Sequence, residues 1–504
     1  MKKYIYSFIT ITLFFIGSCD RYLDQVPDNR AMIDNAEAIK ELLVSAYPKA
    51  SYLPFCEQMS DNADDKGIRR GQGSRKDIDA YEWNEFQEIS QDTPTYYWNA
   101  CYSAIAAANQ AIASIKEIGE GHPEMKPILG EALICRAYAG YMLTTIFCNS
   151  YHPETAAKEM GVPYPKEPGR VVFGHFTRGT LKETFQNIRE DLENGLPLIE
   201  NDYRVPRYHF TKEASAAFAS RFYLILGEWD KVIEHADKAL GNRPAIILRG
   251  WNNPETYVVY TYDELKATYS ASSEESNILL ISCASWWGRN FANTRFGLTT
   301  AVQDSILRTK NPLALQYAFR VFGTDVVRNV PKMKEYFKYN SLNATTGVGY
   351  TMISVFTAEE VLFNRAEAHL MKGDYSKALE DLNIWLSKRL KNYTGSDLQT
   401  LTEEKILQYY SPGSDRIQEF HTFYPVEGNQ RPYLQCILDM RRSEFVHEGI
   451  RWFDIKRIGL PVTHIRKSGS NDEESTLTLS WNDPRKAVQI PQDAQTFGIE
   501  ANPR

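Results

Sequence analysis

Two segments of the chain share one pattern: Leu226-Gly227-Glu228-Trp229-Asp230-Lys231-Val232-Ile233 and Lys372-Gly373-Asp374-Tyr375-Ser376-Lys377-Ala378-Leu379. In each segment an aromatic residue stands two positions after a glycine, and apolar residues then recur about every four positions. A glycine between two such stretches is typical of a helix end, because it adopts backbone conformations that other residues avoid. Each segment therefore predicts a helix, a glycine turn and a second helix.

A helix pair with an aromatic residue at its turn is similar to the repeat unit of tetratricopeptide proteins, in which that residue packs between the helices. The two copies are degenerate, and a long stretch of other sequence separates them. They therefore predict a helical scaffold and not a regular array. The fold class that follows is mostly α, with tetratricopeptide-like helix pairs as its scaffold.

The stretch between residues 98 and 197 predicts three more helices. Apolar residues recur at helical spacing from Trp98 onward, and Pro127 can open a second helix at its first turn. Thr180 and Glu183 have the spacing of a capping box, which begins a third helix. Asn109 falls on the apolar stripe of the first helix, so we expect a buried amide that hydrogen-bonds a neighbouring segment.

Three regions lack this helical pattern and predict long loops: residues 52–97, 241–357 and about 393–433. Within the second region, a short apolar run at residues 278–282 leads into Trp286 and Trp287. Long loops on a rigid scaffold commonly carry the binding residues of a protein. We therefore expect the ligand on a loop-rich face.

The N-terminus has the features of an exported lipoprotein. Two lysines precede an apolar stretch at residues 4–16, which is too short to span a bilayer. Two small residues then precede Cys19, in an arrangement that resembles a bacterial lipobox. The resemblance implies that residues 1–18 are a signal peptide and that Cys19 is acylated; an ordinary secretory signal is the alternative. No later stretch is apolar enough to cross a membrane, so a lipid is the predicted tether.

The composition excludes several classes of protein. The formal net charge of the 504 residues is −7, and an acidic balance disfavours a nucleic-acid groove, so we expect no nucleic-acid partner. The seven cysteines are irregularly spaced and include no CxxC pair, which argues against a zinc site. An oxidising compartment would allow one disulfide, whose pairing the spacing does not decide.

Sequence signatures of common enzymes are missing: GxSxG, HExxH, a Walker loop and a dinucleotide-binding glycine fingerprint. The acidic cluster at residues 61–65 offers oxygen ligands for calcium, but it lacks the spacing of an EF-hand loop. We favour a solvated acidic loop there. The sequence therefore predicts no catalytic residue, no metal and no cofactor.

The segment at residues 441–454 is dense in charges of both signs and in aromatic residues. It could form an active site, or it could form a helix, a glycine turn and a second helix whose arginines and glutamates pair internally. We favour the structural interpretation, because complementary charges interleaved at helical spacing satisfy one another.

Several short motifs resemble those of the SusD/RagB family of lipoproteins, in the same order along the chain. They are the start Cys19-Asp20-Arg21-Tyr22-Leu23-Asp24-Gln25-Val26-Pro27, Gly130-Glu131-Ala132, Arg136-Ala137-Tyr138 with Tyr141, Gly161-Val162-Pro163, Arg365-Ala366-Glu367-Ala368, the block Glu444…Glu448-Gly449-x-Arg451-Trp452-x-Asp454, Ile490-Pro491 and Asn502-Pro503. No single motif decides the match, which depends on their order and on their coverage of residues 19–504.

The resemblance implies a lipid-anchored protein on the cell surface, at the outer membrane, that does not act as an enzyme. Members bind oligosaccharides, or in some cases peptides, and pass them to a SusC-like TonB-dependent transporter. The implied fold is an α-α superhelix with a loop-rich ligand-binding face. Its parts are a signal peptide (1–18), an N-terminal helical region (19–240), a loop-rich binding region (241–357) and a C-terminal region (358–504). Implied partners are the transporter, a glycan and, through Cys19, outer-membrane lipid.

Candidate ligand contacts come from the chemistry of sugars, because the family motifs do not carry its binding residues. Sugar rings pack their flat C–H faces on exposed aromatic rings, and polar side chains around the ring bind the hydroxyls. The first choice is Trp286 and Trp287 with Arg289 and Asn290; as strand neighbours the two tryptophans would point opposite ways, so at most one is core. The second choice lies in the early loop: Trp83, Asp64, Asp65 and Arg69. Four tryptophans on helical stripes are assigned to the core: Trp98, Trp229, Trp385 and Trp452.

Other interpretations stay open. A surface glycoside hydrolase or protease would need a catalytic pair that converges in a cleft. A peptide-capturing member of the family is the other alternative, since peptides also dock on aromatic surfaces. In some sorting systems an aspartate after the lipidated cysteine, as at Asp20, retains the protein at the inner membrane, whereas the family resemblance implies the outer membrane.

Overall fold

The computed structural model describes residues 35–119, 121–169, 176–324, 327–469 and 471–504. The predicted signal peptide and Cys19 lie outside this part of the chain. Within these ranges, no helix is both long enough and apolar enough to span a bilayer. Most of the named elements are helices, which confirms the mostly α fold class.

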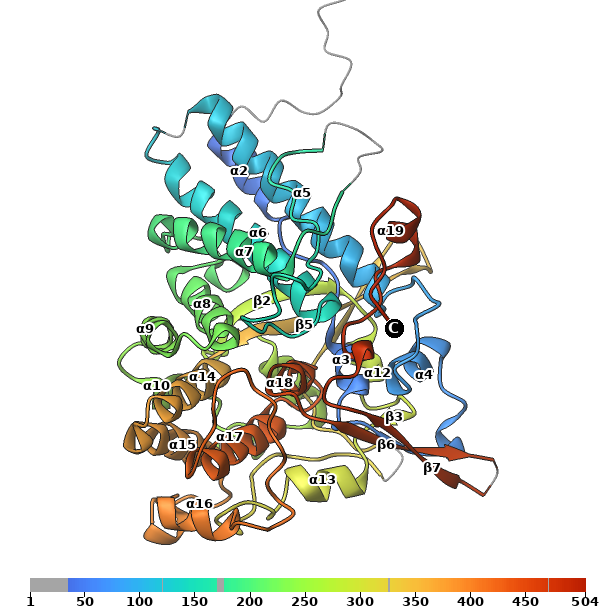
Figure 1. The fold of residues 1–504 in the computed structure, drawn as a ribbon, viewed down its shortest axis with the longest axis vertical. Coiled ribbons are helices and arrows are strands. Elements are labelled where there is room, and N and C mark those ends of the chain that lie inside the picture. Colours follow the sequence, from blue (N-terminus) through green and yellow to red (C-terminus); the bar gives the residue numbers. More distant parts are fainter. Residues whose placement is uncertain (1–34, 120, 170–175, 325–326, 470) are drawn as a thin grey trace, which may run out of the picture.

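A column of helices runs along one side of the molecule (Figure 1). Its first members are α5 (Pro94–Ile118), α6 (Met125–Phe147) and α7 (Leu181–Gly195), and each packs against the next. Thr93 caps α5, and the predicted capping box of Thr180 and Glu183 begins α7. The shorter α2 (Ala36–Leu43) packs against α5 and α6. These caps and apolar stripes place the helices close to where the sequence predicts them.

The two matching segments form the predicted helix pairs, α8 (Lys212–Leu226) with α9 (Trp229–Leu240) and α14 (Ala358–Met371) with α15 (Tyr375–Arg389). Gly227 and Gly373 have φ values of 67° and 80°, in the left-handed region that their turns require. Helix α9 packs against α14, so the two pairs are neighbours although they lie far apart in sequence. Three of the four tryptophans assigned to the core are buried, and Trp229 is half-buried against Tyr424.

Asn109 is buried and serves as the predicted link between segments. Its Nδ2 donates to the backbone oxygen of Pro165 at 2.9 Å, and its Oδ1 accepts from Nη1 of Arg136 at 2.7 Å. Arg136 on α6 in turn pairs with Asp191 on α7 at 2.7 Å. This chain of contacts ties the loop after α6 to three helices.

A three-stranded antiparallel sheet with the order β2-β5-β4 lies beside the helical column. It contains β2 (Asn277–Ala284), β5 (Gly347–Thr357) and β4 (Glu335–Tyr339). The apolar run at residues 278–282 is β2, so the expectation of loops throughout residues 241–357 is wrong for this sheet. Its inner face is buried, whereas most of the edge strand β4 is exposed.

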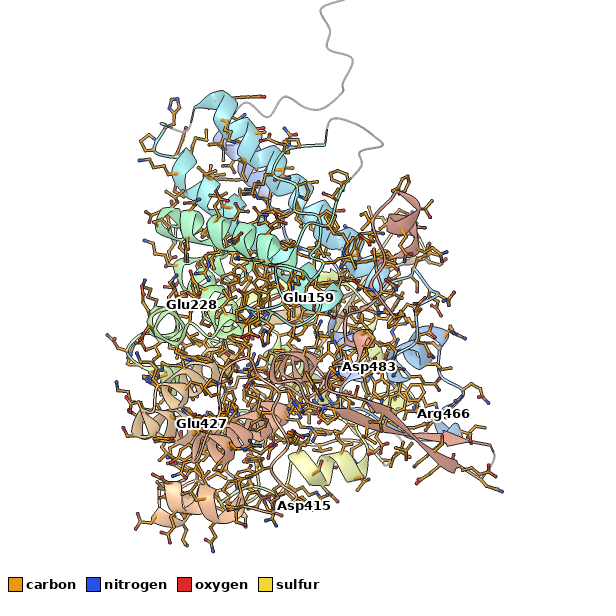
Figure 2. The ribbon with its side chains drawn as sticks, in the orientation of Figure 1. Glu159, Glu228, Asp415, Glu427, Arg466 and Asp483 are labelled. Atoms are coloured by element: carbon orange, nitrogen blue, oxygen red, sulfur yellow. The ribbon has the colours of Figure 1, made fainter. Side chains whose placement is uncertain are left out.

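Most of the other elements are short: α3 (Leu53–Met59), β1 (Asp64–Asp65), η1 (Ile68–Arg70), α4 (Arg75–Tyr81), η2 (Leu196–Leu198), η3 (Pro206–Tyr208), α10 (Pro244–Ile247), α11 (Tyr262–Tyr269), α12 (Trp287–Asn290), β3 (Phe296–Gly297), α13 (Thr300–Ile306), η4 (Asp397–Gln399), α16 (Glu403–Tyr409), η5 (Pro484–Lys486) and α19 (Gln492–Thr496). The hairpin of β6 (Val462–Ser468) and β7 (Glu473–Leu479) projects from the body (Figure 1). Arg466, labelled on this hairpin in Figure 2, pairs with Glu82 at 3.0 Å.

The charged block at residues 441–454 forms the predicted helix, glycine turn and helix, as α17 (Gln430–Glu444) and α18 (Ile450–Ile458). Its charges pair internally only in part. Arg441 pairs with Asp454 at 2.9 Å, but four other members of the block pair with distant segments. Those pairs are Glu444 with Arg389, Glu448 with Lys332, and both Arg442 and Arg451 with Asp61. The block therefore fastens α17 and α18 to the rest of the molecule.

Two arginines and two glutamates form a fully buried network of ion pairs at the C-terminal end of α15. Arg389 binds both oxygens of Glu444, at 2.7 and 3.0 Å, and also Glu359 at 2.9 Å. Arg249 binds the second oxygen of Glu359 at 2.9 Å. The charges balance, and the network joins α14, α15 and α17 to the loop that follows α10.

The six cysteines in the described ranges are buried and form no disulfide with one another: Cys56, Cys101, Cys135, Cys148, Cys283 and Cys436. Burial raises the pKa of the Cys101 thiol, so it stays protonated at neutral pH. These residues act as small apolar packing groups, as expected for buried thiols.

Gly449 lies in the turn between α17 and α18, and its substitution measures how tightly this turn is packed. Its φ is +69°, and a Cβ atom there would lie 2.9 Å from Cβ of Cys56. We expect Gly449→Ala to lower the free energy of unfolding by about 3 kcal/mol, from backbone strain and overpacking together. Gly428→Ala is the matched control: its φ is +51° but nothing lies within 4 Å, so backbone strain of about 1 kcal/mol remains. Urea unfolding of both variants checks this; equal losses would contradict the packing argument.

Candidate functional site

The structure separates the two adjacent tryptophans that the sequence singles out. The chain turns at Trp286, which precedes α12 instead of continuing β2. Trp287 is buried, and its indole Nε1 donates to the backbone oxygen of His447 at 2.9 Å. Trp286 is only half-buried. One of the two therefore belongs to the core and the other faces the surface, although a turn separates them and not the alternation of a strand.

Trp286 begins a strip of aromatic side chains that continues onto β4. Its ring centroid lies 6.2 Å from that of Phe337, which lies 4.9 Å from that of Tyr339. Phe337 and Tyr339 are 38% and 59% exposed. They are two residues apart on one strand, so their side chains share a face of the sheet. We call Trp286, Phe337 and Tyr339 the aromatic strip.

Gly349 makes room for the first ring of the strip. It lies opposite Phe337 in the register of β4 and β5. A Cβ atom at Gly349 would lie 2.7 Å from Cε3 of Trp286, closer than any real contact. The indole therefore packs directly on the backbone of β5, which fixes its plane beside Phe337.

Polar groups border one end of the strip. The Arg289 guanidinium lies over the indole of Trp286, with its Cζ 4.7 Å from the ring centroid, and its Nε donates to Glu335 at 2.7 Å. Such a cation over an indole face is attracted by the ring quadrupole. In this conformation Arg289 covers part of Trp286, and Phe337 and Tyr339 supply most of the exposed ring surface.

The Asp92 carboxylate fixes the backbone of Trp286 by a hydrogen bond. One carboxylate oxygen accepts from the backbone N–H of Trp286 at 2.9 Å, and the other accepts from the Ser285 hydroxyl. Asp92 itself has a φ of 67°, which is rare for a residue with a side chain. Burial raises the pKa of this carboxyl, and the hydrogen bond from Ser285 opposes that effect. A strained, buried residue at this point fits a role in positioning the strip.

A cleft of about 230 Å³ lies beside α12, whose residues Trp287 and Asn290 line it. Asp92 also lines this cleft and accepts from the backbone N–H of Trp286, so one residue contacts both the cleft and the strip. Arg70 reaches across it and donates to the backbone oxygen and the Oδ1 of Asn293, both at 2.8 Å. Asn290, at the end of α12, and Asp77, on α4, also face the cleft.

The structure places Arg289 and Asn290 on α12, directly after Trp286 in the chain, whereas Trp83 lies in the core. The Trp83 indole is buried, donates to the backbone oxygen of Met59 at 2.9 Å, and stacks on His464 with centroids 4.4 Å apart. It has no free face for a ligand. Asp65 is also buried and pairs with Arg295 at 2.7 Å.

The side chain of Arg69 lies outside the described part of the structure, although its backbone belongs to η1. Asp64 is partly buried and accepts from the Thr299 hydroxyl at 3.0 Å. Asp65 thus contributes a buried ion pair to the fold, and Asp64 contributes a hydrogen bond.

The same loop does not fit a calcium ion. Asp61 is turned toward α18, where it pairs with Arg451 at 2.8 Å. Burial alone would raise its pKa, but Arg442 and Arg451 outweigh burial and hold the pKa well below its usual range. Because Asp61 and Asp65 bind different arginines, their oxygens do not converge on a common centre.

Several site residues escaped sequence reasoning, above all Phe337, Tyr339, Asp92 and Arg70. The available signal was the alternation of aromatic residues at positions 337 and 339, which is typical of an exposed strand face. The site as a whole offers an apolar, stepped aromatic surface bordered by guanidinium, amide and carboxylate groups. That combination binds flat apolar faces that also carry hydrogen-bonding groups.

Two family models match the chain. The model described as "Starch-binding associating with outer membrane" matches residues 21–224, and the model of the SusD family matches residues 328–499. Together they include the first helices and the C-terminal block; Trp286 and α12 lie between the two matches, whereas β4 lies within the second.

Whole-chain comparisons agree with these matches. The SusD-like protein P2 of Formosa agariphila is 20% identical over 91% of this chain and 91% of its own length. A SusD superfamily protein of Bacteroides thetaiotaomicron has a TM-score of 0.64 at 20% identity, over 94% of this chain and 100% of the other. A protein of Bacteroides vulgatus titled as a putative sugar binding protein has a TM-score of 0.65 at 20% identity, over 94% and 99%. The two family models and the relative that matches over most of its length show that the chain belongs to the SusD/RagB family, and its fold agrees.

Proposed function

We propose that this protein is a lipid-anchored protein of the cell surface that binds oligosaccharides and delivers them, chemically unchanged, to a TonB-dependent transporter of the outer membrane. The observation that carries the proposal is the aromatic strip with its polar border. Three rings follow one another along the surface, Arg289 and Glu335 lie at their edge, and Asn290 lines the neighbouring cleft.

The chemistry of the strip suits sugars. The C–H face of a pyranose ring packs on an aromatic ring, and its hydroxyls both donate and accept hydrogen bonds. Arg289 and Asn290 can donate to such hydroxyls, and Glu335 can accept from them. A series of rings in steps also suits an extended chain of sugar units better than one compact ligand.

The location and the partner in this proposal follow from other features. Cys19, behind an apolar stretch and two small residues, is the proposed site of acylation. The description of the family model that matches residues 21–224 names both starch binding and the outer membrane. Relatives described as binding sugar lend the proposal further support.

Binding of the chain without its signal peptide to a panel of polysaccharides, oligosaccharides and peptides tests this function. We expect an oligosaccharide to bind and to be recovered intact after prolonged incubation. Release of reducing sugar or of cleaved peptide would contradict the non-catalytic role and favour a hydrolase. Binding of peptides alone would make the protein a peptide-capturing member of the family.

Asp92 provides a test of how the strip is positioned. We expect Asp92→Ala to lower the affinity for the oligosaccharide by about tenfold, because Trp286 loses the acceptor of its backbone N–H. Asp92→Asn keeps one carbonyl acceptor and should retain most of the affinity. Titration calorimetry of both variants, with the melting temperature as a control for folding, checks the prediction. Equal affinity in wild type and Asp92→Ala would contradict it.

A further inference from the structure

A second, larger cavity of about 710 Å³ lies away from the aromatic strip. Three segments form it: the loop at residues 250–258, the stretch at 316–320 and the end of α15 with the residues that follow it, 387–393. None of these segments contributes to the strip or to the cleft beside it. Its size is within the range of sites for small organic ligands.

The charges around this cavity have one sign. Arg320, Lys388 and Lys391 line it, and among the described residues no aspartate or glutamate does. None of the three cations forms an ion pair with a described residue, although the chain carries a net charge of −7. Cations that converge on a cavity without counter-charges create a positive potential, which favours an anionic ligand.

Lys388 and Lys391 lie at the C-terminal end of α15, but they are not needed there to neutralise the helix end. Lysines often occur there because they neutralise the exposed carbonyls of the last turn. In α15 other groups already do so: Asn252 Nδ2 donates to the oxygens of Ser387 and Leu390 at 2.8 and 3.0 Å. The backbone N–H of Ala318 donates to the oxygen of Arg389 at 2.6 Å. The ammonium groups of Lys388 and Lys391 are therefore available to a ligand.

The wall of the cavity is held in shape before any ligand binds. The segments at residues 316–318 and 389–391 are joined by a β-bridge between Tyr317 and Leu390, and Lys391 N–H donates to Gln316 O at 3.0 Å. The Gln399 side chain fastens the next turn, donating to Asn392 O at 2.9 Å and accepting from Thr394 N–H at 2.6 Å. A fixed site loses less conformational entropy on binding than a flexible one.

The other groups in the cavity suit a sugar ring. The ring of Tyr393 is 37% exposed beside Lys391 and supplies a partly open aromatic face. Gln316 and Asn392 add side-chain amides, neither of which is bonded to another described side chain or backbone group. Arg320 is held beside them by its bond to the backbone oxygen of Tyr260.

We propose that this cavity is a second binding site, selective for a sugar unit that carries a carboxylate or a sulfate ester, with Lys388, Lys391 and Arg320 as partners of the anionic group. That the ligand is a saccharide rests on the proposed function; that it is anionic rests on the cavity alone. The protein would then hold a neutral part of a glycan on the aromatic strip and a charged part here.

The test titrates the chain without its signal peptide with three matched disaccharides, ending in glucose, glucuronate or glucose 6-sulfate. These differ only at the sixth carbon of one sugar, so a difference in affinity reports the anionic group. We expect one or both anionic forms to bind at least about tenfold more tightly than the neutral form, and the preference to shrink as sodium chloride is added. Whichever of these two anionic disaccharides binds more tightly shows whether the site prefers a carboxylate or a sulfate ester.

Variants locate the site. The double variant Lys388→Met, Lys391→Met should remove the preference for the anionic form, whereas Lys116→Met, a last-turn lysine of α5, should leave it unchanged. Equal affinity for charged and neutral forms, or a preference that survives in the double variant, would overturn the proposal. If the wild type binds only the anionic forms, and does so through the two lysines, this inference stands and the aromatic strip is contradicted as a site for neutral sugar.

Discussion

Replacing Glu444 by glutamine is expected to lower the free energy of unfolding by about 3–5 kcal/mol. The Glu444 carboxylate is fully buried, binds Arg389 through both oxygens, and accepts from the Trp385 indole at 2.8 Å. The amide of glutamine is neutral, and its NH₂ group is a donor that would face the donors of Arg389 and Trp385. The substitution therefore leaves a buried guanidinium with incomplete compensation, which is the costly way to break a buried ion pair.

Urea unfolding followed by circular dichroism measures this loss. Glu404→Gln is the matched control, because Glu404 is exposed on α16 and its substitution should change stability by less than about 0.5 kcal/mol. Similar stabilities for the two variants would show that Glu444 is solvated or unpaired, and would contradict the network as described.

The same network predicts a dependence of stability on pH. Burial alone would raise the pKa of Glu359, but Arg249 and Arg389 outweigh it and lower the pKa from 4.5 to about 2. A folded-state pKa below the unfolded value contributes stability above the unfolded pKa, and this contribution is lost as pH falls. We expect the urea midpoint to fall between about pH 4.5 and 2, and this fall to be smaller in Glu359→Gln. An identical slope in both proteins would contradict the prediction.

Replacing Trp286 by alanine is expected to lower the affinity for the bound oligosaccharide by about ten- to hundredfold, or roughly 1.4–2.8 kcal/mol. The indole is the fixed member of the aromatic strip, packed on Gly349 and anchored by Asp92. Without it Arg289 loses its ring partner and Phe337 loses a neighbour. Fluorescence or calorimetric titration measures the loss.

Two further variants distinguish a specific effect on the aromatic strip from a general effect on folding. Trp481→Ala is the matched control, since Trp481 is 45% exposed but stacks on His421 outside the site. Gly349→Val should have the same effect as Trp286→Ala from the opposite side, because its side chain would displace the indole. Full affinity in Trp286→Ala, or an equal loss in Trp481→Ala, would contradict the assignment of the strip.

The helical scaffold could be predicted because its signals are local. The Thr180–Glu183 capping box, the glycine turns at Gly227 and Gly373, and the apolar stripe around Asn109 each act within a few residues. The sheet was missed because β4 and β5 lie in a region whose glycines and asparagines indicate turns. Strand pairing depends on partners far away in sequence, which local patterns do not reveal.

Part of the candidate site could be predicted from a local pattern. Trp286, Arg289 and Asn290 stand together in the sequence, so one motif singled out all three as candidates. Phe337 and Asp92 join them only through the register of the sheet and a single hydrogen bond. Trp83 looked like a loop residue with a free ring, but the hairpin residue His464, far along the chain, covers it. Burial of an aromatic ring by a distant segment leaves no local signal.

The most direct test of the account is a crystal structure of the protein with the oligosaccharide that binds most tightly in the panel. We expect a sugar ring packed against Phe337, Tyr339 and Trp286, with hydroxyls hydrogen-bonded to Arg289 or Asn290. A neutral oligosaccharide bound elsewhere, with the aromatic strip bare, would contradict it.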